Sequence, residues 1–389
     1  MARIVFDLDF QMIILFFSTF SKTYHVEISL MGFLIALFSI FTLLSPVFGN
    51  LSDQYGRKRF LTLGLTVFAI GSGLMALAQN WMHVLIARAL SGLATAIFYP
   101  ALLAILGDKY SYEKRTRAMG LVRLSWPIAF VLGVPLVGYS IEHLNWRLPF
   151  VILTVIALVT AVIINLMDSF KEKTDHQQPT ARLEFRHFKT VLLNRSALSG
   201  LLLMLLAAGS IEGIFAYFPT WMETRFQIGE TEISLVYAFM GLGTLFGTLL
   251  AAGIGDKIGP KRCAITGLTV ATGCMVLLSN FSPIPILVIL WLILLGTSFD
   301  LSMTVIPVLL TQSASDAKGT VLSLNQALNA LGTSVGAALS GILWMNYGYA
   351  VLGMFFASTS LMGAVIGYIN IQVEGETEQE NQLPGYSSH

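Results

Sequence analysis

The chain consists mainly of long apolar segments that follow one another with short polar interruptions. A helix that crosses the hydrocarbon core of a bilayer needs about 20 mostly apolar residues. Because backbone polar groups cannot remain unpaired in lipid, such segments are expected to be helices. The predicted spans are 4–20, 29–50, 60–78, 83–106, 118–140, 148–167, 196–219, 231–252, 263–280, 285–308, 318–342 and 349–370. The sequence therefore predicts an all-α polytopic membrane protein with twelve transmembrane helices.

Composition excludes several other classes of protein. Only 12% of the 389 residues are charged, whereas soluble domains carry about 25%. The net charge of +1 gives no general attraction to nucleic acid. Cys263 and Cys274 would lie about 16 Å apart on one helix, so we expect neither a disulfide nor a metal site from them. The sequence lacks the ATP-binding loop and the hydrolase and metalloprotease motifs, so neither an enzyme nor a cofactor is expected.

Lysine and arginine are concentrated in alternate loops. On one side lie Arg57, Lys58, Arg59, Lys109, Lys114, Arg115, Arg117, Lys257, Lys261, Arg262 and Lys318. The other side holds Lys22, Arg147 and Arg225. Since short cytoplasmic loops are enriched in these residues, both termini are predicted to be cytoplasmic in a multi-pass plasma-membrane protein.

The sequence contains an internal repeat. Residues 51–59, LSDQYGRKR, recur as residues 254–262, IGDKIGPKR, at an offset of 203 positions. The same offset relates two pairs of glycines in the fifth and eleventh predicted helices, Gly133 to Gly336 and Gly138 to Gly341. A parallel repeat of this kind is typical of transporters that rock about a central site.

The repeat predicts four regions. Two pseudo-symmetric six-helix halves cover 1–167 and 196–370. A charged cytoplasmic linker, 168–195, joins them, and an acidic tail, 371–389, is expected to be disordered because it has few apolar residues.

Three motifs carry a resemblance to a known family. Residues 49–59, GNLSDQYGRKR, resemble the signature loop of the major facilitator superfamily. Residues 85–92, LIARALSG, are similar to its fourth-helix arginine motif. Residues 133–138, GVPLVG, followed by WRLPF at 146–150, resemble the fifth-helix motif of its drug:proton antiporters and sugar-efflux relatives. The resemblance implies a proton-coupled transporter that works by alternating access.

The loop motif and its second copy are interpreted as a cytoplasmic latch for the outward-facing state. Glycines in the loop permit a tight turn, its aspartate can lie at a helix N-terminus, and its arginines can pair with acids or lipid phosphate. The latch residues are Gly49, Asp53, Gly56, Arg57, Arg59, Asp256, Gly259 and Arg262. In the fifth helix, Gly133, Pro135 and Gly138 are expected to allow close packing and a bend.

Ionisable residues inside the predicted helices indicate function, because each costs about 2.5–3.5 kcal/mol to insert. Asp9, Arg88, Glu212 and Asp300 are the candidates for proton or substrate binding. Asp9 and Glu212 come from different halves and could face one cavity, in which Arg88 would modulate their protonation. The alternative is a structural ion pair or polar contact between helices. Arg123 is interpreted as a snorkelling or latch residue near the cytoplasmic end.

Trp126 and Tyr217 are candidates for an apolar wall that contacts an amphiphilic substrate. The leading hypothesis is proton-coupled efflux of a small amphiphilic or sugar-like molecule. The alternatives are a proton symporter that imports an organic acid, with Arg88 binding the carboxylate, and a transporter-like membrane sensor. The expected partners are the substrate, protons and the lipid bilayer, and the protein is expected to function as a monomer.

Overall fold

The computed structural model describes residues 2–109, 122, 124–167, 191, 193–313 and 318–371, without the side chains of 53, 107–109, 256 and 318–320. Within these residues every regular element is a helix, so the predicted all-α class is confirmed. Arg123, the acidic tail apart from residue 371, and most of the predicted linker lie outside the described residues.

The first group of helices forms six spans. The first span is built from α1 (Ala2–Met12), η1 (Ile13–Phe16) and α2 (Phe17–Tyr24). The second is built from η2 (Ile28–Met31), α3 (Gly32–Thr42) and α4 (Ser45–Tyr55). The third and fourth are α5 (Arg57–Ala76) and α6 (Trp81–Lys109). The fifth comprises α8 (Ser125–Ile128), the π-helix η3 (Ala129–Gly133) and α9 (Val134–His143), and the sixth is α10 (Leu148–Leu166).

The second group begins with α12 (Arg195–Ala216) and α13 (Phe218–Phe226), followed by α14 (Glu230–Ile258), α15 (Pro260–Asn280) and α16 (Pro285–Ser313). It ends with α17 (Lys318–Asn370), which is interrupted at Gly348, where φ is 75° and ψ is 179°. The described residues contain 11 helical segments long and apolar enough to cross a membrane, and the last has 50 residues. Because Gly348 divides that segment, each of the twelve predicted spans has a counterpart.

Two glycines form matching turns between helices. Gly56 separates α4 from α5 with a φ of 105°, and Gly259 separates α14 from α15 with a φ of 92°. A side chain would be strained at these angles, which explains the residue type. The two positions are 203 residues apart, so the repeat seen in the sequence is also a repeat of backbone conformation. We call the end of the bundle that carries these two turns the motif end.

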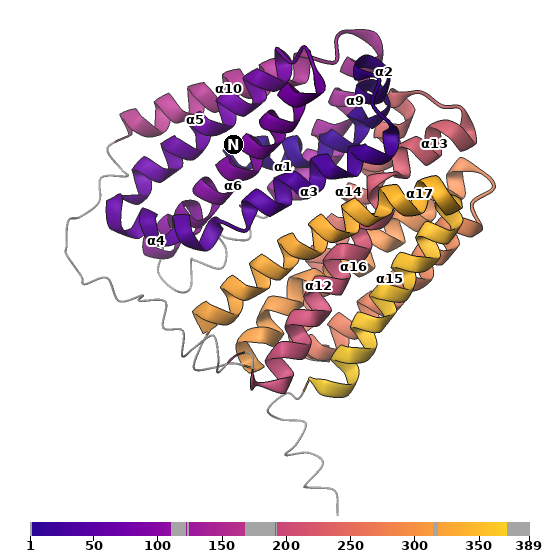
Figure 1. Ribbon diagram of the computed structural model, residues 1–389. Coiled ribbons are helices and arrows are strands. Elements are labelled where there is room, and N and C mark those ends of the chain that lie inside the picture. Colours follow the sequence, from indigo (N-terminus) through magenta and orange to yellow (C-terminus); the bar gives the residue numbers. More distant parts are fainter. Residues whose placement is uncertain are drawn as a thin grey trace, which may run out of the picture.

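The two groups of helices meet mainly toward the other end of the bundle, which we call the far end and which carries α2, α13 and the start of α14. Contacts between the groups join α3 to α17, and α9 and η3 to α14. Figure 1 shows the indigo-to-magenta group above the red-to-yellow group, with the ribbons diverging toward α4. The structure is therefore held together across the groups at the far end.

Glycines at equivalent repeat positions lie in both of these contacts. A Cβ on Gly138 of α9 would meet the side chain of Ser234 in α14. A Cβ on Gly341 of α17 would meet the carbonyl oxygen of Ser29 in η2. Close approach of the backbones requires small residues here, so the packing between the groups is nearly symmetric.

Candidate functional site

A buried ion pair joins the first and fourth spans. The Arg88 Nη1 atom of α6 lies 2.8 Å from Asp9 Oδ2 of α1, and the two side chains are 0% and 2% exposed. The Phe38 ring of α3 lies beside the guanidinium, 4.9 Å from its carbon to the ring centroid. Because the pair is removed from water, each charge offsets the desolvation cost of the other, and either charge alone would destabilise the fold.

The pair leaves hydrogen-bonding capacity unused. Among the described residues, Arg88 Nε and Nη2 are enclosed and have no hydrogen-bond partner. Glu212 Oε1 of α12 is also enclosed without a partner, and its carboxyl lies within electrostatic range of Arg88. One cation therefore stands near two acids that come from different groups of helices.

The two acids occupy equivalent positions of the repeat. Glu212 follows Asp9 by 203 residues, which is the offset of the loop motif. The position equivalent to Arg88 holds Trp291, whose Nε1 is enclosed without a partner among the described residues. The offset in the sequence could have revealed this relation. The repeat has thus duplicated the acid but not the cation.

Asp300 lies in a different environment. Its carboxylate accepts a hydrogen bond from the Thr248 hydroxyl, which joins α16 to α14 within the second group. The side chain is buried, with 9% of the residue exposed. A role for Asp300 in proton or substrate binding stays a prediction.

Trp126 belongs to a row of aromatic rings beside the ion pair. Its ring centroid is 6.0 Å from that of Phe10 and 5.8 Å from that of Phe130. Phe10 in turn contacts Phe38, and Phe130 stacks on Tyr237 of α14 with centroids 6.1 Å apart. The row connects the surroundings of Arg88 to the second group. A role for Trp126 in substrate contact stays a prediction.

Tyr217 lies at the junction of α12 and α13, apart from this row. Its hydroxyl lies 2.7 Å from the carbonyl oxygen of Ser29 and 2.9 Å from that of Ile28, and accepts from the backbone N–H of Gly32. Its ring stacks on Trp344. The residue is wholly buried and ties the two groups together. A role in substrate contact stays a prediction.

Polar contacts also cross between the groups at the far end. The Lys22 ammonium lies 3.0 Å from Glu223 Oε1, which also accepts a hydrogen bond from Ser18. The Glu142 carboxylate accepts from the backbone N–H of Thr231 at the start of α14. A cavity of about 230 Å³ is lined in part by Ser18, Lys22, Glu142 and Glu223. The far end is thus closed by ion pairing and helix capping.

Basic side chains of the motif loop contact other helices of the first group. The Arg57 guanidinium donates to the carbonyl oxygen of Ala104 in α6, and Lys58 donates to those of Asn165 and Met167. Arg59 and Arg262 are exposed, and Gly49 faces Pro100. The side chains of Asp53 and Asp256 lie outside the described residues. The latch stays a prediction.

The fifth-helix motif coincides with a change of helix type. Gly133 ends the π-helix η3 and packs against Leu8 of α1, and Pro135 lies in the first turn of α9. Proline lacks the N–H that would bond to the carbonyl of residue 131, which lies in η3. The irregularity expected at Pro135 therefore extends over the preceding turn, where π-helices often mark functional sites.

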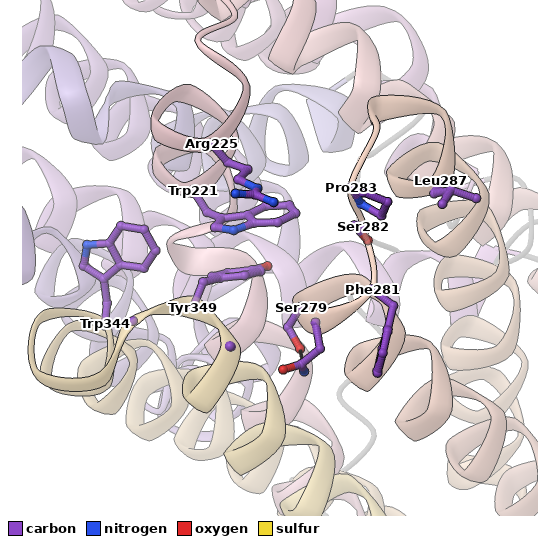
Figure 2. Close-up of a pocket in the computed structure, with 12 residues that line it drawn as sticks. Trp221, Arg225, Ser279, Phe281, Ser282, Pro283, Leu287, Trp344 and Tyr349 are labelled. Carbon is purple, nitrogen blue, oxygen red and sulfur yellow. Dashed lines mark hydrogen bonds between the residues drawn. The ribbon is translucent and has the colours of Figure 1, made fainter.

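A second cavity, of about 620 Å³, lies at the far end of the second group and was not expected from the sequence. The Trp221 ring stacks on Tyr349 with centroids 4.6 Å apart. Figure 2 shows Arg225 above these rings and Phe281 and Leu287 on the other side of the cavity. None of the predicted site residues lines it.

Comparisons with known proteins agree with this architecture. A model of the Major Facilitator Superfamily matches residues 1–228 and 201–385. The uncharacterized MFS-type transporter YwfA of Bacillus subtilis (strain 168) is 26% identical over 369 residues, covering 92% of this chain and 88% of the relative. Multidrug resistance protein 2 of the same organism is 29% identical, covering 86% and 85%. Multidrug resistance protein MdtG of Enterobacter lignolyticus (strain SCF1) is 26% identical, covering 86% and 80%. The chain therefore belongs to the Major Facilitator Superfamily.

Proposed function

We propose that this secondary transporter exports small amphiphilic molecules in exchange for protons. The observation that carries the proposal is the buried Arg88, which one acid of each half, Asp9 and Glu212, can approach. The relatives named as multidrug resistance proteins support efflux of amphiphilic compounds. The row of aromatic rings at Trp126 supports the same substrate class, because apolar surfaces are needed to bind such molecules.

The chemistry follows from the number of charges. When both acids are ionised, Asp9, Glu212 and Arg88 carry a net charge of −1, and protonation of either acid removes it. A cationic substrate and a proton can each neutralise the site, so they compete for it. Competition for one site is the minimal requirement for antiport.

In alternating access, the central site would open first to one end of the bundle and then to the other. We assign the motif end to the cytoplasm because Arg57, Lys58 and Arg59 lie there, in agreement with the distribution of basic residues expected for cytoplasmic loops. With the far end closed, the structure then corresponds to an inward-facing state of a plasma-membrane protein that works as a monomer. The Tyr217 and Lys22 contacts would break when the far end opens.

Import of an organic acid with protons is the second candidate. It is supported by the two nitrogens of Arg88, Nε and Nη2, that lack partners among the described residues, because they could donate to a carboxylate. The Asp9 charge beside Arg88 disfavours this function. The names of the relatives also favour efflux.

Vesicles reconstituted with the purified protein distinguish these functions, with ethidium as the cationic probe. If the protein is an antiporter, vesicles with an acidic lumen should accumulate ethidium, and dissipating the pH gradient with nigericin should release it. Symport requires the opposite gradient, and a sensor would bind without transport. Protein-free vesicles are the control. Absence of gradient-dependent movement of ethidium and of a panel of other amphiphilic cations would reject the proposal.

A further inference from the structure

The first span carries a second buried acid, Asp7, which is 4% exposed. It precedes Asp9 by two residues, which places it about 3 Å closer to the motif end and on another face of α1. Arg3 Nε lies 2.7 Å from Asp7 Oδ1 and 2.9 Å from Oδ2. The Arg3 side chain is 21% exposed and lies over the Tyr99 ring, so the carboxyl is in contact with a partly solvated group.

The Ser125 hydroxyl lies between two acceptors. It is within hydrogen-bond distance of Asp7 Oδ2 and 2.7 Å from the carbonyl oxygen of Val122. A hydroxyl has one proton and cannot donate to both. If Asp7 is ionised, Ser125 donates to it. If Asp7 is protonated, Asp7 donates to Ser125 and Ser125 donates to Val122, so the same positions satisfy both states.

We propose that Asp7, with Ser125 as its hydrogen-bond switch, is a second proton-binding group on the motif-end side of Asp9, separate from the Asp9–Arg88 pair. The proposal rests on the proposed proton coupling. The step is a proton transfer alone: Asp7 takes a proton from water near Arg3 and later returns it there.

The surroundings of Asp7 set its charge balance. The first span contributes Arg3 and Asp9, and α6 contributes Tyr99 and Arg88. The fifth span contributes Ser125, while Arg123 lies outside the described residues. Tyr237 and Gly241 of α14 contact the fifth span at Phe130. Because its side chain is 21% exposed, the Arg3 guanidinium can be solvated by water when Asp7 is neutral.

Protonation of Asp7 would also change how α1 holds the fifth span. Ser125 lies in α8, directly before η3, which packs on α14 of the other half. A second hydrogen bond between α1 and the fifth span, which Gln11 Nε2 donates to the carbonyl oxygen of Trp126, does not involve Asp7. Proton binding would thus reverse the direction of the Asp7–Ser125 hydrogen bond and leave the Gln11–Trp126 hydrogen bond unchanged. This would couple the acid to the interface between the halves.

Infrared spectroscopy of the reconstituted protein, titrated with pH in the absence of substrate, tests the proposal. A carboxylic C=O band present in the wild type should be missing in Asp7→Asn. In Ser125→Ala the band should move to higher frequency because the acid loses its hydrogen-bond partner. Ser140→Ala, which changes a buried serine in the same span that bonds to Asn145, is the matched control and should leave the band in place.

Identical carboxylic C=O bands in the wild type and Asp7→Asn at every pH would overturn the proposal, since Asp7 would then be permanently ionised by Arg3. A band lost in Asp7→Asn but unchanged in Ser125→Ala would overturn the role of Ser125. The measurement needs neither ethidium nor a gradient. It can therefore fail while the transport experiment succeeds, and the reverse.

Discussion

The two halves resemble each other in packing and differ in charge. Both place an acid at the same repeat position, but the N-terminal half supplies Arg88 where the C-terminal half has Trp291. Asp9 is therefore paired within its own half, whereas the enclosed oxygen of Glu212 has no partner among the described residues. The difference leaves one cation near two acids, and the proposed coupling rests on this asymmetry.

Removing both acids should have the largest effect on stability. Asp9→Asn combined with Glu212→Gln leaves Arg88 buried without a counter-charge, which should lower the free energy of unfolding by about 3–5 kcal/mol. Unfolding by SDS in mixed micelles measures this. Adding Arg88→Met should restore most of the loss, because an apolar replacement needs no counter-charge. A double variant as stable as the wild type would show that Arg88 does not depend on these acids.

Removing one acid should distinguish the halves. Asp9→Asn should cost about 1–3 kcal/mol, less than the double variant, because Glu212 can approach Arg88. Glu212→Gln should change stability by less than about 1 kcal/mol, since the carboxyl oxygen has no partner to lose. Equal effects in the same unfolding assay would contradict the asymmetry. A double-mutant cycle gives the coupling between the two acids.

Equivalent glycines should behave alike. Gly138→Val and Gly341→Val each force a side chain into a backbone contact between the halves, which should cost about 1–3 kcal/mol in both cases. Spin-label distances across the far end should lengthen in both variants. Gly253→Ala is the control, because a Cβ there meets nothing within 4 Å. An effect confined to one glycine would show that the packing is less symmetric than the contacts indicate.

The smallest effects are expected at the surface. Lys22 and Arg225 are repeat equivalents, but Lys22 pairs with Glu223 across the halves, whereas Arg225 makes no ion pair with the described residues. Lys22→Ala should cost at most about 1 kcal/mol, and less at high salt. Arg225→Ala should leave the thermal midpoint unchanged. A larger loss from Arg225→Ala would point to a partner for it at the second cavity.

The sequence was sufficient for the spans, because length and hydropathy determine where helices cross a bilayer. The 203-residue offset also predicted the matched turns at Gly56 and Gly259. Position along a helix axis does not determine the direction of a side chain, however. The hydrogen bonds of Tyr217 to the other half therefore could not be predicted, since the direction of its side chain is set by the break between α12 and α13. Asp7 was missed because its partner Ser125 is 118 residues away.

Transport by the two single variants Asp9→Asn and Glu212→Gln tests the central claim most directly. Each should retain slow exchange of ethidium across vesicles without a pH gradient, because the row of aromatic rings at Trp126 is unchanged. Each should lose accumulation driven by an acidic lumen, since the remaining acid no longer has a competitor for Arg88. Full gradient-driven accumulation by both variants would contradict the account and exclude Asp9 and Glu212 as the coupling acids.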